Sequence, residues 1–302
     1  MARYFGIDAG GTQVKWAVVS DDYRIERQGS MPTRFDGADE AIDAFCSLVK
    51  PFKSGVDGIG ISMPGIFSEQ DPDGVVGVGG ALHYLDGCPL GRVVGERTGL
   101  VTRVDNDAVC GALGEYAVGA LKGVGVGVMV VIGSGIGGSI VIDGHVFRGA
   151  HGAAGGFSFM GTDASRPISP GAVFGDACSW RSLRDRICAE KGIESDESID
   201  GFKLFSMVEA GDPAALRGLD AYARTLDALL MDIQAVVDPE VIVVGGGISR
   251  RRELFEALER QLDQSSTFPF LALPKIRQAV CGNDANIFGA VRTLRLALGI
   301  DR

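Results

Sequence analysis

Residues 4–20 read YFGIDAGGTQVKWAVVS, and this stretch decides the fold that we expect. An apolar run leads into the turn DAGGT at residues 8–12, and a second run follows in which apolar and more polar residues alternate. This pattern predicts a β-hairpin. Because a glycine-rich turn lets backbone N–H groups approach phosphate oxygens, and the hydroxyl of Thr12 adds a donor, we expect the turn to bind phosphate.

The same pattern recurs in the second half of the chain, where residues 128–147 read VMVVIGSGIGGSIVIDGHVF. The repeat predicts two halves of similar architecture, with the functional site in the cleft between them. A dinucleotide-binding fold is the competing interpretation of these glycines, but it requires a helix after them, whereas the strand-like SIVI follows here. Taken singly, either turn is equally consistent with an ordinary tight turn.

Residues 123–142 contain no charged side chain, over about the 20 residues that a transmembrane helix needs. Their many glycines and β-branched valines disfavour a helix and favour strands. We therefore predict two buried strands joined by a glycine turn in place of a membrane span.

A third glycine cluster lies in DPEVIVVGGGISRRRELFEALERQL. We predict a buried strand over Val241–Val244 and a helix that starts near Ser249. The three glycines between them, at 245–247, offer room for a nucleotide base or ribose, although a plain strand-to-helix connection is the alternative.

The bulk composition narrows the function classes. The 302 residues suit a two-lobed α/β protein, and the formal net charge of -10 disfavours binding to nucleic-acid phosphate. Six scattered cysteines without a Cys-x-x-Cys pair favour reduced thiols, a cytoplasmic setting and no structural zinc. No export signal is expected at the N-terminus.

Two acids flank an asparagine at Asp105-Asn106-Asp107, where a short strand passes into an alanine-rich helix. Ligands of open α/β sheets bind at the carboxyl ends of strands, so this position suits chemistry. Asp107 is the candidate general base for a substrate hydroxyl, while Asp105 either assists magnesium or caps the helix. An aspartate that only caps the helix is the alternative for Asp107.

Taken together, these motifs resemble the ROK family of sugar kinases and repressors over nearly the whole chain. The similar segments are GIDAGGT at 6–12, DNDAVCGALGE at 105–115, IGSGIGGSI at 132–140, RGAHGAAG at 148–155, VVGGGIS at 243–249 and GNDANIFGA at 282–290. The resemblance implies an α/β fold with the two-domain, actin-like sugar-kinase (ribonuclease H-like) architecture and an active-site cleft between the domains. It also implies an N-terminal sugar and phosphate domain at 1–107, completed by a C-terminal helix at 286–302, and a larger nucleotide-binding and dimerisation domain at 108–285.

The resemblance further implies roles for individual residues in a kinase that uses ATP and Mg²⁺. The substrate would contact the catalytic base Asp107 together with Asn106, Gly65, Gly80, His151 and Gly156, a structural role being the alternative for His151. The cofactor would contact Asp8, Gly10, Gly11, Thr12, Lys15, Gly133, Ser134, Gly135, Gly245, Gly246 and Gly247, with Asp8 also serving Mg²⁺.

The loop after Arg148 departs from the family pattern. Relatives commonly continue it as Gly-Glu-x-Gly-His, whereas Gly156 and Phe159 occupy the glutamate and histidine positions here. The cysteine-rich zinc motif is also missing, since the segment GTDASRPISPGAVFGDACSW at 161–180 contains only Cys178, so no zinc site is expected. Loss of two hydrogen-bonding groups would weaken binding of a free hexose by about 1 to 3 kcal/mol for each unmatched partner.

We therefore expect an acceptor with a substituent at its anomeric carbon, such as a β-glucoside, and phosphorylation of its 6-hydroxyl. Repacking of a surface that does not touch substrate is the plainer interpretation of the loop. Glucokinase or N-acetylmannosamine kinase activity is the alternative within the class. A catalytically degenerate, sugar-binding transcriptional regulator is the alternative from another class. We expect sugar and ATP as partners, a homodimer, and neither nucleic acid nor membrane.

Overall fold

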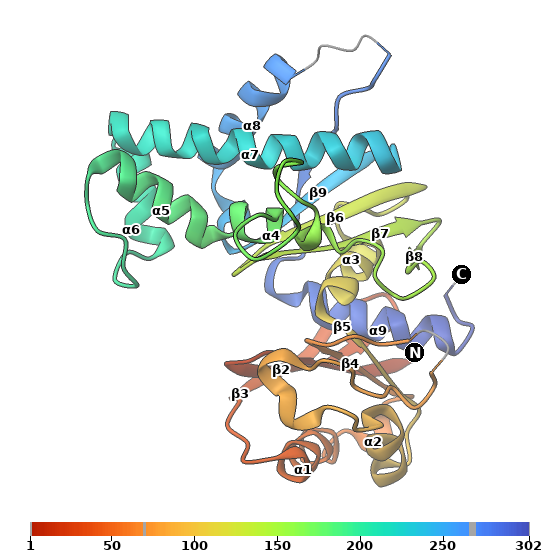
Figure 1. The fold of residues 1–302 in the computed structure, drawn as a ribbon. Coiled ribbons are helices and arrows are strands. Elements are labelled where there is room, and N and C mark those ends of the chain that lie inside the picture. Colours follow the sequence, from red (N-terminus) through yellow and green to blue (C-terminus); the bar gives the residue numbers. More distant parts are fainter. Residues whose placement is uncertain (1, 69–70, 266–269, 302) are drawn as a thin grey trace. The chain divides into compact units, whose positions relative to one another are not determined.

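The computed structural model describes residues 2–68, 71–265 and 270–301, and its ribbon is shown in Figure 1. The chain forms two compact units, and each is described by itself. Unit 1 comprises 1–123, 143–154 and 280–302, and unit 2 comprises 124–142 and 155–279.

This division differs from the predicted domain boundaries. The predicted first domain ends at Asp107, whereas the helix that begins there, α3 (Asp107–Val118), lies in unit 1. The segment 143–154 also lies in unit 1, although it was expected in the second domain. The roles of the two predicted domains stay a prediction. Arg302, at the end of the predicted C-terminal helix, lies outside the described residues.

Unit 1 is an α/β unit built on one five-stranded sheet. Its elements, besides α3, are β1 (Arg3–Ala9), β2 (Gln13–Ser20), β3 (Ile25–Pro32), α1 (Ala38–Val49), η1 (Lys53–Gly55), β4 (Ile59–Met63), η2 (Gly80–Leu85), α2 (Leu90–Thr98), β5 (Thr102–Asn106), β8 (His145–Phe147), η5 (Gly282–Asp284) and α9 (Ala285–Ala297). The strand order is β3-β2-β1-β4-β5. β1 and β2 form the predicted hairpin, while β4 and β5 run parallel to β1.

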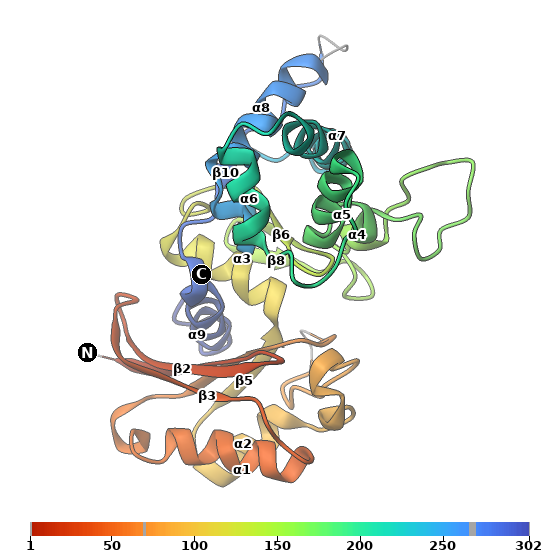
Figure 2. The same cartoon turned by 90° about the vertical axis from the view of Figure 1, so that its left-hand side faces the viewer.

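Helices cover both faces of this sheet (Figure 2). Alternate residues of β1 point to opposite faces, as the period of a strand requires. Phe5 and Ile7 pack in a core that includes residues of α1 and α2, whereas Tyr4 packs with Ile287 and Val291 of α9. The carboxyl ends of β1, β4 and β5 are therefore held on a sheet buried on both sides.

Helices α3 and α9 approach each other unusually closely. A Cβ added to Gly114 would lie 2.0 Å from the carbonyl oxygen of Ala285, and one added to Gly289 would lie 1.7 Å from that of Cys110. Only glycine permits this backbone contact. The close packing fixes the start of α9 beside α3, the helix that carries Asp107.

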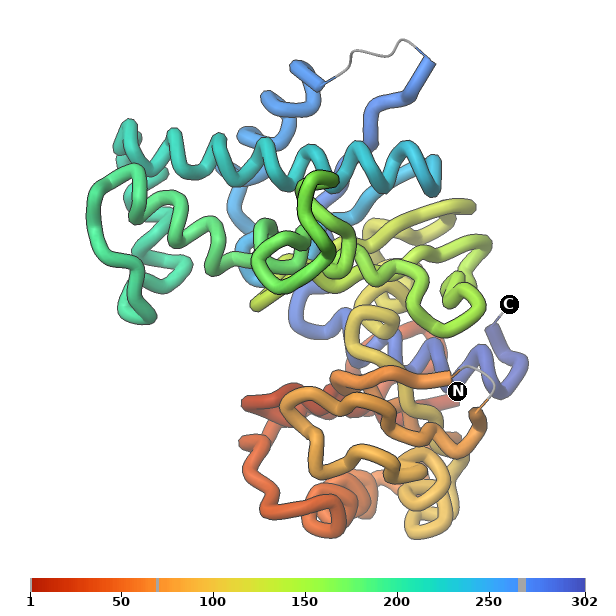
Figure 3. Tube along the Cα trace, viewed as in Figure 1, coloured from red at the N-terminus to blue at the C-terminus, as the bar shows by residue number. Residues whose placement is uncertain are grey.

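Unit 2 contains the second glycine hairpin and a group of helices. Its elements are β6 (Val126–Ile132), β7 (Ile136–Ile142), η3 (Phe157–Phe159), α4 (Phe174–Ala177), α5 (Trp180–Lys191), α6 (Gly201–Glu209), α7 (Pro213–Val237), β9 (Val241–Gly246), η4 (Gly247–Arg250), α8 (Arg252–Ser265) and β10 (Ile276–Gln278). The long helix α7 packs against α5 and α8 and can be followed in Figure 3. It begins after Asp212, whose side chain accepts from the N–H groups of Ala214 and Ala215, with Pro213 in its first turn.

The second sheet repeats the connectivity of the first. Its strands within unit 2 follow the order β10-β9-β6-β7, which matches β5-β4-β1-β2 of the first sheet element by element. β6 pairs antiparallel with β7 and parallel with β9, as β1 does with β2 and β4. The predicted repeat of one architecture in two halves is thus confirmed at the level of topology.

The uncharged segment 123–142 is confirmed as two strands joined by a glycine turn. Across the described residues, the helices lack the combination of length and apolar character that crossing a bilayer requires. Two predicted helix limits were wrong. The helix after the third glycine cluster begins at Arg252, because a 3-10 turn occupies 247–250, and the C-terminal helix ends at Ala297.

Candidate functional site

The carboxylate of Asp8 lies at the end of β1 among polar partners from three other elements. Ser62 Oγ and Asn286 Nδ2 donate to its Oδ1 at 3.3 and 3.1 Å. Lys15 faces it across the hairpin, with Nζ 3.8 Å from Oδ2. Asp8 is 9% exposed. The structure therefore holds a buried carboxylate next to the ammonium group of Lys15 and the side-chain amide of Asn286.

Asn106, not an aspartate, caps helix α3. Its Oδ1 accepts hydrogen bonds from the N–H groups of Ala108 and Val109, at 2.9 and 3.2 Å. Its Nδ2 donates to the carbonyl oxygen of Gly65 at 2.9 Å. The capping role considered for Asp107 is therefore filled by its neighbour, and Asp107 occupies the first turn, where the helix dipole favours a negative charge.

Burial raises the pKa of Asp107 above its usual range. The N–H group of Ala108, which donates to Asp107 Oδ1 at 2.8 Å, opposes that rise, and the negative charge of Asp8 adds to it. The pKa of Asp8 is likewise raised by burial, against the lowering effects of Asn286, Lys15 and Ser62. A carboxylate whose pKa is moved toward neutral pH is better suited to accept a proton than one with an ordinary value.

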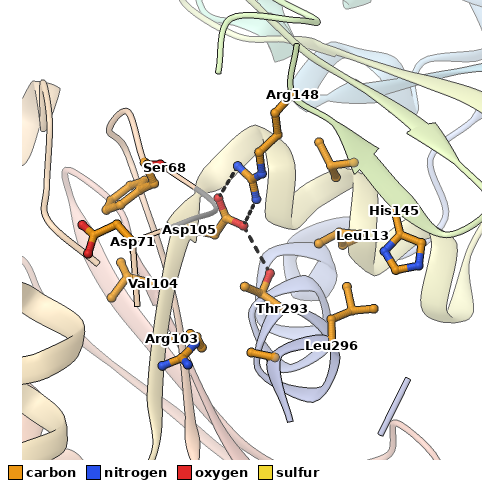
Figure 4. Close-up of a pocket in the computed structure, with 13 residues that line it drawn as sticks. Ser68, Asp71, Arg103, Val104, Asp105, Leu113, His145, Arg148, Thr293 and Leu296 are labelled. Carbon is orange, nitrogen blue, oxygen red and sulfur yellow. Dashed lines mark hydrogen bonds and ion pairs between the residues drawn. The ribbon is translucent and has the colours of Figure 1, made fainter. Parts of the chain in front are cut away.

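The third acid of the cluster, Asp105, is occupied by an arginine. Arg148 donates to both of its carboxylate oxygens, at 3.1 and 2.5 Å, and Asp105 is 2% exposed (Figure 4). Thr293 Oγ1 lies 3.5 Å from Asp105 Oδ2. The sequence suggested that Asp105 assists magnesium or caps the helix. In the structure its carboxylate instead forms an ion pair with Arg148, and Asn106 caps the helix.

The first glycine turn is open to solvent and braced from one side. Gly11 and Thr12 are exposed, while Thr33 Oγ1 donates to the carbonyl oxygen of Gly10 at 2.6 Å. The N–H group of Thr33 donates to the carbonyl oxygen of Thr12 at 3.0 Å. The turn is thus held by Thr33, which follows β3, and its tip stays accessible to an anion.

The remaining predicted substrate residues of unit 1 lie in two loops. Gly65 follows β4 with φ of 151°, and Gly80 begins η2 with φ of 58°. His151 is exposed and lines a cavity of about 320 Å³ together with Ile66, Phe67, Ser68, Arg148, Gly149, Ala150 and Gly152.

In unit 2 the structure brings three predicted cofactor residues into one cavity of about 500 Å³. Gly133, Ser134 and Gly247 line it with Ile132, Trp180, Asp200, Gly201, Phe202, Phe205, Ile248 and Arg251. Gly245 and Gly246 do not line this cavity. Gly245 lies buried in β9, and Gly246 has φ of 98° with its Cα packed against the carbonyl of Ile132.

The aromatic wall of this cavity escaped the sequence analysis. The guanidinium of Arg251 lies 5.2 Å from the ring centre of Phe202 and 5.3 Å from that of Phe205. Trp180 begins α5, and its main-chain N–H group donates to the carbonyl oxygen of Gly133 at 3.1 Å. Flat apolar rings beside a cation suit a planar heterocycle. No local motif marks these residues, because the rings come from α5 and α6, and the cation comes from Arg251, the residue before α8.

Gly156 and Phe159 lie in unit 2 on a short exposed segment. Gly156 precedes η3 with φ of -71°, a value open to any residue, and Phe159 is 74% exposed. Phe157 between them is buried, and its ring occupies the space where a side chain at Gly138 would lie. Cys178 is fully buried, and burial raises the pKa of its thiol to about 12. Within the described ranges, no group of three or more His, Cys, Asp or Glu side chains is placed to hold a metal ion.

Comparison with known proteins identifies relatives along the full chain. The model of the ROK family matches residues 4–295. A β-glucoside kinase of Klebsiella pneumoniae is 30% identical to this chain over 285 residues, which cover 94% of this chain and 93% of that protein.

Solved structures agree. A ROK family protein from Streptococcus pneumoniae TIGR4 in complex with sucrose has a TM-score of 0.85 at 26% identity, covering 98% of this chain and 99% of that one. A ROK family glucokinase from Streptomyces griseus in complex with glucose and AMPPNP has a TM-score of 0.80 at 25% identity, covering 98% and 100%. These similarities confirm the expected α/β fold of the actin-like, sugar-kinase type.

Proposed function

Because this chain belongs to the ROK family, we propose that it transfers the γ-phosphoryl group of ATP to the 6-hydroxyl of a sugar. The observation that carries the proposal is Asp107, a partly buried carboxylate in the first turn of a helix capped by Asn106, with a pKa raised above its usual range. The relatives named above include a β-glucoside kinase and a glucokinase, so the regulator alternative is not favoured.

Asp107 is the group that takes the proton of the attacking hydroxyl. Phosphoryl transfer needs little covalent help from protein beyond positioning, charge stabilisation and a base for the nucleophile. Asn106 keeps Asp107 in place by capping α3, and Gly65, whose carbonyl Asn106 engages, ties the loop after β4 to the same point. We propose that the acceptor hydroxyl lies against Asp107, with Asn106, Gly65, Gly80 and His151 around the sugar.

Each unit contains donor groups of the types that Mg²⁺ or the phosphates of ATP bind. Asp8 offers carboxylate oxygens, the ligand type that Mg²⁺ prefers. When bound, the metal would neutralise charge on the transferred phosphoryl group. We propose that Gly10, Gly11, Thr12 and Lys15 of unit 1, and Gly133, Ser134 and Gly135 of unit 2, serve the phosphates. The base and ribose would occupy the aromatic cavity that Gly247 lines, and Gly245 and Gly246, which precede it at the end of β9, would act only through the backbone that leads to it.

The acceptor that we propose is a β-glucoside, or another glucose-type sugar with a substituent on its anomeric carbon. The support is chemical: at the positions where family members commonly carry glutamate and histidine, this chain has Gly156 and the exposed ring of Phe159. Glycine leaves room, and an exposed ring offers a stacking face to a second sugar. Glucokinase and N-acetylmannosamine kinase activities are the alternatives.

The test is release of ADP from Mg-ATP with cellobiose, gentiobiose, glucose and N-acetylmannosamine, and the position of the new phosphate ester determined by NMR. Asp107→Asn is the matched variant, because it keeps the shape and removes the base. Turnover with the disaccharides that disappears in Asp107→Asn supports the proposal. Turnover on free hexoses alone excludes the β-glucoside assignment, and no turnover in a folded, ATP-binding protein excludes the kinase.

The acceptor assignment can be tested separately by restoring the family pattern. Both positions accept larger or polar side chains, since Gly156 has negative φ and Phe159 is exposed. The double substitution Gly156→Glu, Phe159→His should raise kcat/KM for free glucose and lower it for cellobiose. Equal changes for both sugars would exclude a role of these positions in recognising the anomeric substituent.

The remaining proposals concern context. We propose a homodimer formed through the domain at 108–285, with sugar binding in the domain at 1–107 and 286–302, and a cytoplasmic location. Light scattering of the purified chain checks the oligomeric state.

A further inference from the structure

We propose that the buried ion pair between Asp105 and Arg148 positions the loop at 149–153, hereafter the His151 loop, relative to Asp107, and thereby sets affinity for the acceptor. Both are positioning residues. The inference rests on the proposed sugar kinase function and adds to it two residues that need not touch substrate. All of the groups concerned lie in unit 1.

The pair is built for rigidity. The two guanidinium contacts to Asp105 are bidentate, at 3.1 and 2.5 Å, and the exposed fractions of the two side chains are 2% for Asp105 and 17% for Arg148. Figure 4 shows Arg148 reaching down from the β8 segment to the end of β5, with Thr293 of α9 on the other side of the carboxylate. A planar fork on a buried carboxylate fixes both distance and orientation.

On one side, this contact leads directly to the catalytic residues. Asp105 Oδ1, which accepts from Arg148, also accepts from the N–H group of Asn106 at 2.9 Å. Asn106 in turn caps α3 through Ala108. Movement of the Asp105 carboxylate therefore shifts the strand end that presents Asp107.

On the other side, the main chain of Arg148 closes the His151 loop. The N–H group of Ala154 donates to the carbonyl oxygen of Arg148 at 3.1 Å, so the ends of the loop are joined. Gly149 and Gly152 have φ of 69° and 72°, which lets the backbone turn within this short ring. The loop is thus a closed unit whose base carries the guanidinium that binds Asp105.

Arg148 also lines two cavities of about 320 Å³ each. One contains the residues of the His151 loop, and the other contains Asp105, Arg103, His145 and Thr293. Arg148, Phe67 and Ser68 line both. Without the pair, the lining that the cavities share loses its polar anchor, and the His151 loop loses its fixed distance from Asp107.

The test compares Arg148→Met, Arg148→Lys and Asp105→Asn with the parent protein. Misplacement of a substrate-positioning element by about 1 Å costs up to ~100-fold in rate. We expect Arg148→Met and Asp105→Asn to raise KM for the acceptor ~10-fold or more and to change KM for ATP less than ~2-fold. Arg148→Lys keeps the charge and one contact, and should recover part of the loss.

The matched control is a second buried ion pair of unit 1. Asp301, whose side chain is 11% exposed, accepts from Tyr23, Arg292 and Arg295, and these three donors lie outside the His151 loop and outside residues 105–108. Asp301→Asn should lower thermal stability without a selective change in acceptor KM. An equal selective rise in the control, or equal rises of KM for acceptor and ATP in Arg148→Met, would overturn the positioning role.

Hydrogen–deuterium exchange tests the positioning role of the ion pair without relying on kinase activity. In Arg148→Met, the amides of 149–154 and 106–109 should exchange faster than in the parent protein, while those of β1 stay protected. If the parent phosphorylates no acceptor, the kinase proposal fails, and the exchange data still decide whether the pair holds the loop. Unchanged exchange in both segments, or unchanged acceptor KM in an active protein, overturns the inference.

Discussion

The two glycine hairpins share one framework and differ in chemistry. The two hairpins can be aligned on the last paired residue before each turn, which is Ala9 in the first and Ile132 in the second. One position before Ala9, Asp8 faces Lys15 on β2 and Ser62 on the parallel strand β4. In the second hairpin the corresponding residues are Val131, Gly137 and Gly245. The repeated topology therefore supplies two similar turns, but of the positions compared here only those of the first hairpin carry charged side chains, and the same backbone can thus serve different chemistry.

The glycines differ in the same way. In the first half the position after Ser62 on β4 is a buried Met63, whereas the corresponding position on β9 is Gly246. There a Cβ would lie 2.0 Å from the carbonyl oxygen of Ile132. At the ends of β6 and β9 there is thus no room for a side chain at Gly246. The aromatic cavity lies next to the glycine turn of this second hairpin.

The largest effect is expected from making the first hairpin like the second. Asp8→Val should lower kcat by about 100-fold or more, because the carboxylate proposed to serve Mg²⁺ is lost. Thermal stability at pH 7 should not fall, since burial is what raises the pKa of Asp8, and valine removes the cost of burying its charge. Steady-state kinetics and calorimetry check both parts. Full activity in Asp8→Val would break the distinction between the hairpins.

The next effect tests the tight approach in unit 2. Gly246→Ala should lower the free energy of unfolding by about 2 kcal/mol or more, because of its positive φ and the clash with Ile132. Gly247→Ala is the matched control, since nothing lies within 4 Å of its added Cβ, and it should change stability by less than about 0.5 kcal/mol. Urea unfolding of the two variants measures the difference, and equal stabilities would contradict the packing argument.

A smaller effect is expected from the loss of the N-terminal cap residue, and it should differ between α3 and α9. Asn106→Ala should destabilise α3 by about 1 kcal/mol, because it removes the cap acceptor. Asp284, at the cap position of α9, has no capping hydrogen bond from its side chain among the described residues, so Asp284→Ala should cost under about 0.5 kcal/mol. Chemical denaturation compares them. The comparison fails if Asp284→Ala costs as much as Asn106→Ala.

The smallest effect is a shift in pH dependence. If Asp107 acts as an ionised base, kcat/KM rises with pH, with an acidic midpoint above the ordinary aspartate value, because burial raises the pKa of Asp107. The charge of Asp8 also raises that pKa, so Asp8→Asn should move the midpoint of its residual activity to lower pH. The binding of ATP analogues to the aromatic cavity should not follow the same midpoint. A midpoint that stays in place would remove Asp8 from the electrostatics of Asp107.

The contribution of Asp107 to the free energy of unfolding changes with pH in the opposite direction to that of an acid in a salt bridge. Its pKa is raised on folding, so between the unfolded and the folded pKa the native state binds more protons. Its contribution to the free energy of unfolding therefore falls as pH rises through that window. Asp107→Asn should remove this contribution, which pH-dependent denaturation can measure.

What the sequence by itself determined is local. The alternation of apolar residues around Gly10 and Gly11 and around Gly133 specified both hairpins, and the step from a short strand to a helix marked Asp107. These features depend on hydrophobic period and backbone freedom within a few residues. The helix start after Gly247 was misplaced, because a 3-10 turn and a helix differ there by hydrogen bonds that composition does not encode.

Only the tertiary structure decided which distant groups meet. Asn286 donates to Asp8 from 278 positions away, and Arg148 binds Asp105 across 43. The aromatic cavity likewise brings Phe202 of α6 and Arg251, which lies between η4 and α8, to the second glycine turn. The physical reason is that hydrogen bonds, ion pairs and ring contacts depend on distance in space, which the packing of whole helices against a sheet sets, whereas strands and turns follow from the order of neighbouring residues.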